Sequence, residues 1–218
     1  MKNLFYFIAL GAALVVGDIT AAQPPLAVGR VVDAATKCGL LAATDYSDKT
    51  LTPAELASLK KEIAKQDWIA EIPNLGPTLL ANYPAVIGIH KHSGFRLAVH
   101  YLGDDIMLLG CSVPVVNGDQ KEQTAMIETM LASTEALVGR GTEVRTWLDT
   151  EWKKSWDLCY QEGVDRREVI RKKRFGAFLV TVWGVPPDII FLNCVRAAKS
   201  PDPTAPSVTA PAGQEPHH

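Results

Sequence analysis

The sequence predicts an α+β protein in which a mostly antiparallel sheet of about five strands packs against about four helices. Three observations lead to this prediction. Apolar residues recur at helical spacing near the N-terminus and between residues 119 and 162, they alternate between residues 85 and 113, and two β-rich apolar runs lie between residues 175 and 195. Short turns separate the strands, which favours antiparallel pairing.

Composition places the chain among ordinary globular proteins. It has 218 residues, of which 47% are hydrophobic and 21% are charged, and its formal net charge is -2. These values exclude a wholly disordered, collagen-like or coiled-coil chain. A net charge near zero also argues against nucleic acid as the partner.

The first residues have the pattern of a secretory signal peptide. Lys2 precedes the apolar run Leu4–Val16, and the small residues Thr20–Ala22 follow. The run is shorter than the roughly 20 residues of a membrane-spanning helix, so we expect cleavage after Ala22, although an uncleaved anchor is an open alternative. We therefore expect a periplasmic or secreted protein that keeps no transmembrane segment after cleavage.

This leaves one α+β domain over residues 23–199. From residue 200 onward, prolines with serine, threonine and alanine predict a disordered tail.

Two helices are expected at the start of the domain. The first spans residues 26–42 and turns Cys38 toward the core. The second spans residues 53–68, because Thr52 and Glu55 form the pattern of a capping box at its start.

The segment between these helices invites comparison with a calcium-binding loop. Residues 44–55 have the length of such a loop and end in Glu55, but Thr44 replaces the first aspartate and Lys49 replaces the turn glycine. The capping box accounts for Glu55 without a metal, and we expect none.

A β-hairpin followed by a third strand is expected from residue 84 onward. If the turn is His92–Gly94, one face of the hairpin carries apolar residues, and the third strand (106–113) has its own core face. The expected hairpin face is Ile87, Ile89, Phe95, Leu97, Val99 and Tyr101, and the third strand adds Met107, Leu109, Cys111 and Val113.

Three histidines fall in the hairpin. His90, His92 and His100 could suggest a transition-metal site. In the expected register, however, His90 and His100 lie about 13 Å apart along the strands, which is too far for one ion. We expect polar-face histidines and no metal.

Helices are then expected at residues 119–138 and 143–162. The second has an apolar stripe that includes Trp152, Trp156 and Cys159, while Trp147 falls at the edge of this stripe. A core position and a ligand-facing position therefore remain open for Trp147.

A strongly basic run follows this helix. Such runs are usually solvated, yet in an exported protein this one could bind an acidic protein surface, an anionic lipid headgroup or an acidic glycan. Nucleic acid is disfavoured because no aromatic residues interleave with the run. The possible partner-binding residues are Arg166, Arg167, Arg171, Lys172, Lys173, Arg174 and Trp147.

Two apolar strands, at residues 175–183 and 189–195, should join the same sheet. With them, the chain has four cysteines, and export to an oxidising compartment predicts two disulfides. The pairing Cys38–Cys111 with Cys159–Cys194 would tie helices to strands; like-with-like pairing and four buried thiols are the alternatives.

No local signature of a serine hydrolase, zinc protease, nucleotide-binding loop or dinucleotide enzyme occurs in the sequence. A Cys111–His100 pair is conceivable, but the two side chains should point to opposite faces. No catalytic, cofactor or metal residue is therefore predicted. We expect a non-enzymatic binding or interaction module, such as an inhibitor, an immunity-type protein or an envelope-assembly component; a small extracytoplasmic hydrolase with a non-local active site is the alternative.

Overall fold

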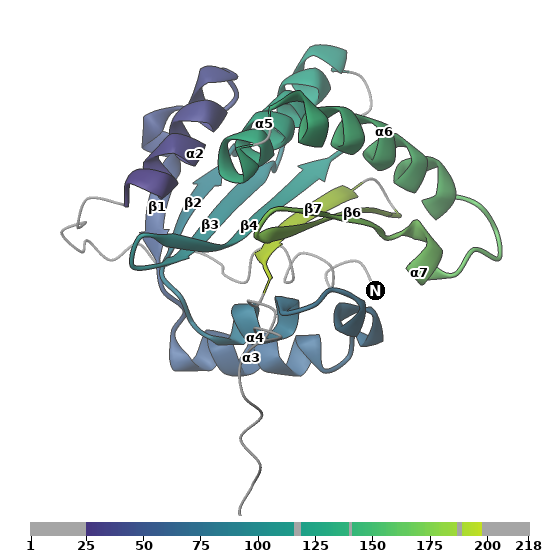
Figure 1. Ribbon diagram of the computed structural model, residues 1–218, viewed down its shortest axis with the longest axis horizontal. Helices are drawn as coiled ribbons and strands as arrows, with labels where there is room; N and C mark the ends of the chain where they lie inside the picture. The colour runs from purple at the N-terminus through teal and green to yellow at the C-terminus, as the bar shows by residue number, and fades with distance from the viewer. Residues whose placement is uncertain (1–24, 116–118, 140, 187–188, 198–218) are drawn as a thin grey trace, which may run out of the picture.

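A seven-stranded antiparallel sheet separates two layers of helices (Figure 1). The computed structural model describes residues 25–115, 119–139, 141–186 and 189–197, so the expected signal peptide and the expected tail lie outside the described residues. The α+β class and the antiparallel sheet are confirmed. The described residues form seven strands and six α-helices, where about five and about four were expected.

The strands follow the order β1-β2-β3-β4-β7-β6-β5 across the sheet. Their bounds are β1 Tyr46–Lys49, β2 Ala85–Ile89, β3 Arg96–Leu102, β4 Asp105–Pro114, β5 Arg171–Phe175, β6 Phe178–Val185 and β7 Ile189–Arg196. The expected C-terminal hairpin, β6–β7, does join the same sheet. It does so in the middle, where β7 pairs with β4.

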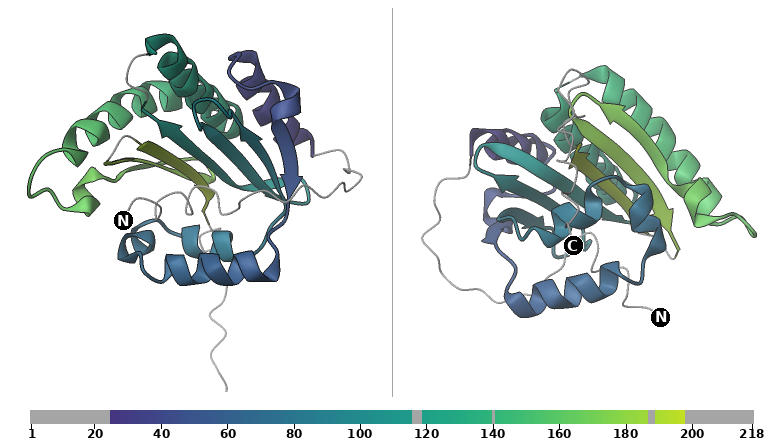
Figure 2. Two further views of the ribbon diagram at one scale, coloured as in Figure 1. Left: turned by 180° about the vertical axis from the view of Figure 1, so that it is seen from behind. Right: turned by 60° about the horizontal axis from the view of Figure 1, so that its bottom comes forward.

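The helices lie on both faces of the sheet (Figure 2). Their bounds are α2 Leu26–Lys37, α3 Pro53–Ile63, α4 Leu75–Leu80, α5 Gln120–Val138, α6 Thr142–Cys159 and α7 Arg166–Val169, with 3₁₀ turns η1 Ala43–Asp45 and η2 Asp67–Glu71. Helices α2, α5 and α6 cover one face, and α3, η2 and α4 lie against the other.

Helix starts agree with the sequence better than helix ends do. The Thr52 hydroxyl accepts from the Glu55 N–H at 3.3 Å, and the Glu55 carboxylate accepts from the Thr52 N–H at 2.8 Å, so the capping box is confirmed. Helix α2 ends at Lys37 instead of residue 42, since Gly39 has a φ of 77° that ends the helix.

The face under α2, α5 and α6 holds the larger core. Side chains of β3, β4, β6 and β7 alternate toward these helices, as pleated strands require. Leu97, Leu109 and Leu192 are fully buried there against Met126 and Met130 of α5. The opposite face packs Trp183 and Phe191 against Trp68 of η2 in a second, smaller cluster.

The expected β2–β3 register is wrong by one residue. Ile89 pairs with Arg96, so the turn is the four-residue segment 91–94 instead of three residues. The Gly94 N–H donates to the His90 carbonyl at 2.9 Å and closes this wider turn. A shift of one residue exchanges the two faces. Ile87 and Ile89 therefore lie on the face opposite the Leu97 side chain.

Two strands were not expected, and both lie at sheet edges. Strand β1 falls in the segment compared with a calcium loop, and Lys49 forms an ion pair there with Glu55 at 3.0 Å. Strand β5 contains the last four residues of the basic run, whereas Arg166 and Arg167 belong to α7. In the described residues, no group of three or more His, Cys, Asp and Glu side chains could hold a metal ion. The described helices also include none with the length and apolarity to cross a membrane.

The expected disulfides are absent, because all four cysteines are free thiols. Cys194 lies opposite Val180 of β6, whereas the Cys159 sulfur lies next to Gly184 of the same strand. Four residues, or about 13 Å, separate Val180 from Gly184, so Cys159 and Cys194 are too far apart for a disulfide. Cys38 ends α2 beside Thr129 of α5.

The like-with-like alternative fails in the sheet as well. Cys111 and Cys194 are diagonal neighbours on β4 and β7, and diagonal positions are wider apart than directly opposed ones. Neither expected connectivity, Cys38–Cys111 with Cys159–Cys194 or helix with helix, fits this fold.

Candidate functional site, an apolar pocket beside a basic edge strand

A pocket of about 190 Å³ opens where the end of α6, the end of α7 and the end of β6 meet η2, directly before β5 begins. Its lining comes from four separate parts of the chain. The lining residues are Trp68, Leu158, Cys159, Val164, Val169, Ile170, Trp183, Gly184, Val185 and Pro186.

A buried hydroxyl fixes the frame of this pocket. Ser155 of α6 is fully buried, and its hydroxyl donates to the Val169 carbonyl at 2.8 Å and accepts from the Gly184 N–H at 2.8 Å. One side chain thus joins α6 to α7 and β6. Gly184 allows the close approach, since a Cβ there would lie 2.9 Å from the Cys159 sulfur.

Two tryptophans form one wall. The ring centroids of Trp68 and Trp183 are 5.0 Å apart, and Trp183 stacks on Phe191 at 5.5 Å. The Trp68 Nε1–H donates to Gln66 Oε1 at 2.8 Å, which satisfies the polar edge of that indole. A group bound in the pocket would therefore contact the aromatic carbons of Trp68 and Trp183 at this wall.

The chemistry of the pocket is apolar. Cys159 supplies the one ionisable side chain of the lining, and its thiol donates to the Trp156 carbonyl at 3.1 Å. An engineered apolar cavity of about 150 Å³ is large enough to bind benzene. A volume of about 190 Å³ therefore suits one aromatic ring or one branched aliphatic group.

Four of the six residues of the basic run, Arg171 to Arg174, lie along β5, the edge strand next to this pocket. Its side chains alternate between the two faces of the sheet and meet carboxylates on both. On the α6 face, Arg171 contacts Glu151 at 2.6 Å and Lys173 contacts Glu143 at 3.5 Å. On the pocket face, Lys172 contacts Glu71 at 3.6 Å.

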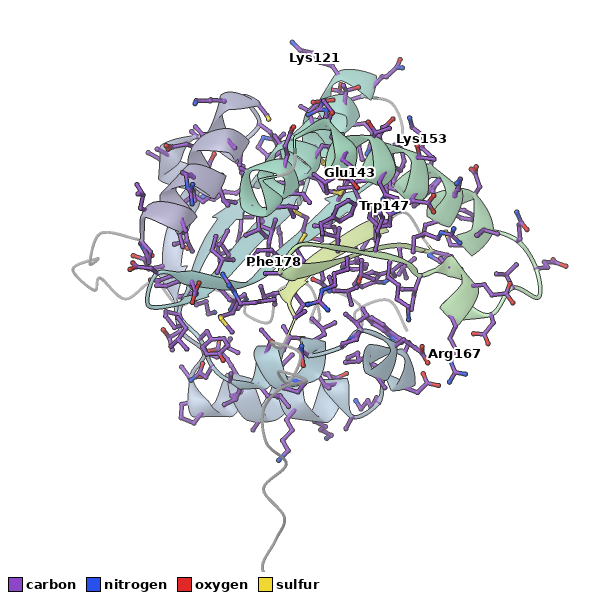
Figure 3. All side chains as sticks on the ribbon, in the orientation of Figure 1. Lys121, Glu143, Trp147, Lys153, Arg167 and Phe178 are labelled. Atoms are coloured by element: carbon purple, nitrogen blue, oxygen red, sulfur yellow. The ribbon has the colours of Figure 1, made fainter. Side chains whose placement is uncertain are left out.

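The remaining basic residues differ in what they contact. Arg167 of α7, which is labelled in Figure 3, lies 3.7 Å from Glu71. The Arg174 side chain is exposed and donates to the Gly176 carbonyl at 3.2 Å, and no carboxylate of the described residues lies within 4 Å of it. Arg166 belongs to α7, but its side chain lies outside the description.

Trp147 lies on the other face, between α6 and the sheet (Figure 3). Its ring meets Phe175 edge-on at 5.5 Å, and the Lys173 ammonium lies 4.9 Å from the centre of the Phe175 ring. Trp147 is half-buried against the core in this arrangement. The fold thus brings Trp147 near one member of the basic run, but not near the pocket.

The Cys111–His100 pair does not form a site. The Cys111 side chain is buried under α5 and α6, and His100 lies one residue beyond Val99, whose side chain shares that buried face. His100 therefore points to the opposite face. Its imidazole pKa is lowered mainly by burial, although a hydrogen bond with the Tyr83 backbone acts the other way.

Sequence reasoning missed the pocket because its walls are distant in the chain. The available signal was weak: Trp68 is the residue at which the second helix is expected to end, and nothing near it in the sequence indicates a binding role. Comparison of the chain with protein-family models, curated proteins and solved structures found no match. The site must therefore be interpreted from its own geometry.

Proposed function

We propose that this protein is an exported binding module that holds one apolar group of a partner in the pocket between α6, β6 and η2. The observation that carries the proposal is the pocket itself, an apolar concavity with two tryptophans fixed in its wall. Export is supported by the signal-peptide pattern of residues 1–22.

The size of the pocket favours a single anchor over a complete small-molecule ligand. Pockets for drug-sized ligands span about 300 to 1,000 Å³, whereas this one has about 190 Å³. Protein interfaces commonly place one buried aromatic or aliphatic anchor in a pocket of a preformed surface. The partner is thus a protein segment with one large apolar side chain.

The alternative of a small hydrolase needs a different lining. A hydrolytic site requires convergent ionisable groups within hydrogen-bond reach of one another. Among the residues that line the pocket, Cys159 is the one ionisable side chain, and its thiol contacts a backbone carbonyl. No observation here favours hydrolysis over binding.

Peptide selection tests the proposal directly. The full chain is immobilised and challenged with a random peptide display library, and selected peptides should share one large apolar residue. Val164→Phe places a ring in the pocket and should abolish their binding. Val138→Phe makes the same change at a half-buried valine that ends α5, and binding should persist.

Two results would overturn the proposal. One is selection of no peptides by the folded chain. The other is a set of peptides that bind the Val164→Phe protein as tightly as the original, with folding of both variants verified by circular dichroism.

A further inference from the structure

We propose that the free edge of β5 binds an extended acidic segment of the partner as an added strand, with the apolar residue of that segment in the pocket. This inference rests on the proposed function and names the chemistry of the partner. It is carried by the continuity of three features: a sheet edge, a row of cations and the pocket.

The sheet ends at β5, which pairs with β6 on one side only. Among the described residues, β5 makes no backbone hydrogen bonds to another strand on its outer side. Such an edge presents unpaired N–H and C=O groups that an extended peptide can use. Strand addition is therefore available here without rearrangement of the sheet.

The pocket and the cations share one face of this edge. Lys172 pairs with Thr181 and Arg174 pairs with Leu179, so both basic side chains lie on the sheet face that carries Trp183. Ile170 lines the pocket and has extended backbone directly before β5, two residues ahead of Lys172, so the alternation of the strand carries on to it. An added strand would thus meet a pocket, then one cation, then a second.

Spacing fixes the pattern of the partner. Consecutive residues on one face of a strand are about 6.8 Å apart, and directly opposed residues share a face. The anchor opposite Ile170 would then be followed by acidic residues two and four positions away. Arg174 is the better cation for them, since Glu71 already contacts Lys172 at 3.6 Å.

A peptide suits this surface better than an anionic membrane does. Membrane attraction needs several unshielded cations on one broad face. Here Lys173 and Arg171 point to the α6 side, where Glu143 and Glu151 contact them. On the pocket face, Glu71 contacts Lys172, and Arg174 has no carboxylate of the described residues within 4 Å. The available charge is thus confined to one strand, which suits an extended chain better than a broad membrane surface.

The test uses three synthetic peptides and two charge-reversed proteins. The first peptide has a central Phe with Glu two and four residues away on both sides, so its direction does not matter. The second replaces every Glu by Gln, and the third keeps Glu but carries N-methyl groups on alternate backbone nitrogens. The protein variant Lys172→Glu/Arg174→Glu is matched by Lys60→Glu/Lys61→Glu on the exposed surface of α3.

We expect the Glu peptide to bind the original protein about tenfold more tightly than the Gln peptide, and salt to reduce this difference. Lys172→Glu/Arg174→Glu should remove the preference, and Lys60→Glu/Lys61→Glu should retain it. The N-methylated peptide with its methyl groups toward β5 should lose binding, because it cannot pair with the edge. Vesicles with anionic lipid should not compete.

The outcomes separate this inference from the proposed function. Equal binding of the Glu, Gln and N-methylated peptides, abolished by Val164→Phe, would overturn strand addition and leave the pocket as the binding site. If the Val164→Phe protein binds the peptides as tightly as the original protein does, the proposed function is overturned instead. If anionic vesicles compete with the Glu peptide, the partner of this surface is an anionic membrane and the inference of an acidic peptide is overturned.

Discussion

The Ser155 hydroxyl accepts the N–H of Gly184 at 2.8 Å, so a helix side chain satisfies the backbone of a strand in the core. It also donates to the Val169 carbonyl at 2.8 Å. Ser155→Ala would leave both backbone groups buried and unpaired. We expect the free energy of unfolding to fall by about 2 to 4 kcal/mol, measured by urea denaturation.

The matched control for this change is Thr150→Ala in the same helix. The Thr150 hydroxyl is exposed and donates to the Thr146 carbonyl of its own helix at 3.0 Å. Its removal should change stability by less than about 0.5 kcal/mol. If the free energy of unfolding falls equally in Ser155→Ala and Thr150→Ala, the two buried hydrogen bonds of Ser155 contribute no more than an exposed one.

The cysteines should behave as two classes of thiol. Burial raises the pKa of the Cys194 thiol to about 12 and that of Cys111 well above its usual range. Burial also raises the pKa of the Cys38 thiol, so exposure separates the two classes. Cys111 and Cys194 are buried and should stay unmodified in the folded protein, while the half-buried Cys38 and Cys159 react with maleimide. When the protein is denatured without reductant and alkylated, its mass should show four modified thiols. Two modified thiols would indicate one disulfide, and none would indicate two.

Acid should weaken the contact between α6 and β5. Burial raises the pKa of the Glu151 carboxyl, but hydrogen bonds from Lys154 and Arg171 outweigh it, so the net pKa lies below 4.5. A lowered folded-state pKa gives stability that is present above 4.5 and lost as the pH falls through the folded value. The difference in the free energy of unfolding between the original protein and Glu151→Gln should therefore shrink between about pH 5 and pH 3, the range in which carboxylates titrate. Urea titrations at several pH values measure this difference.

The basic residues of β5 should also keep two copies of this chain apart. Like charges on an edge strand oppose pairing with an identical edge. Lys172→Thr/Arg174→Thr should increase self-association with concentration, as followed by analytical ultracentrifugation. Lys60→Thr/Lys61→Thr makes the same change on α3 and should remain unassociated; equal association of both variants would assign the effect to net charge alone.

Trp147 should matter for stability and not for the pocket. Its ring packs edge-on against Phe175 at 5.5 Å, on the sheet face away from Trp183. Trp147→Leu should lower the free energy of unfolding by about 1 to 2 kcal/mol. Peptides selected on the original protein should bind this variant with unchanged affinity, and a loss of affinity would return Trp147 to the binding surface.

Helix starts and buried strands could be predicted from the sequence because local chemistry determines them. The capping box at Thr52 needs residues only three positions apart, and the apolar run of β7 is buried on both faces whatever its neighbours are. The edge strands β1 and β5 have no such local signal. Their pairing is fixed by the neighbouring strand, and the basic residues of β5 are typical of solvated segments.

The hairpin register and the pocket needed three-dimensional information for different reasons. One additional residue in the turn before Gly94 moves every side chain of a strand to the other face, and both turn lengths fit the sequence. The pocket joins Trp68 to Trp183 through tertiary packing, which no pattern near either residue encodes. The cysteines were misjudged because an even count and expected export say nothing about distance.

The pairing of β7 with β4 has a consequence for how the chain is synthesised. Strands β1 to β4 can pair as soon as they leave the ribosome, but the inner edge of β4 stays open until α5, α6, β5 and the β6–β7 hairpin have all been made. Long-range pairing of this kind slows folding and leaves an apolar edge exposed meanwhile. A nascent chain interrupted before β6 would therefore expose an apolar sheet edge that the complete protein covers, and keeping that edge unpaired during translation is a task for chaperones.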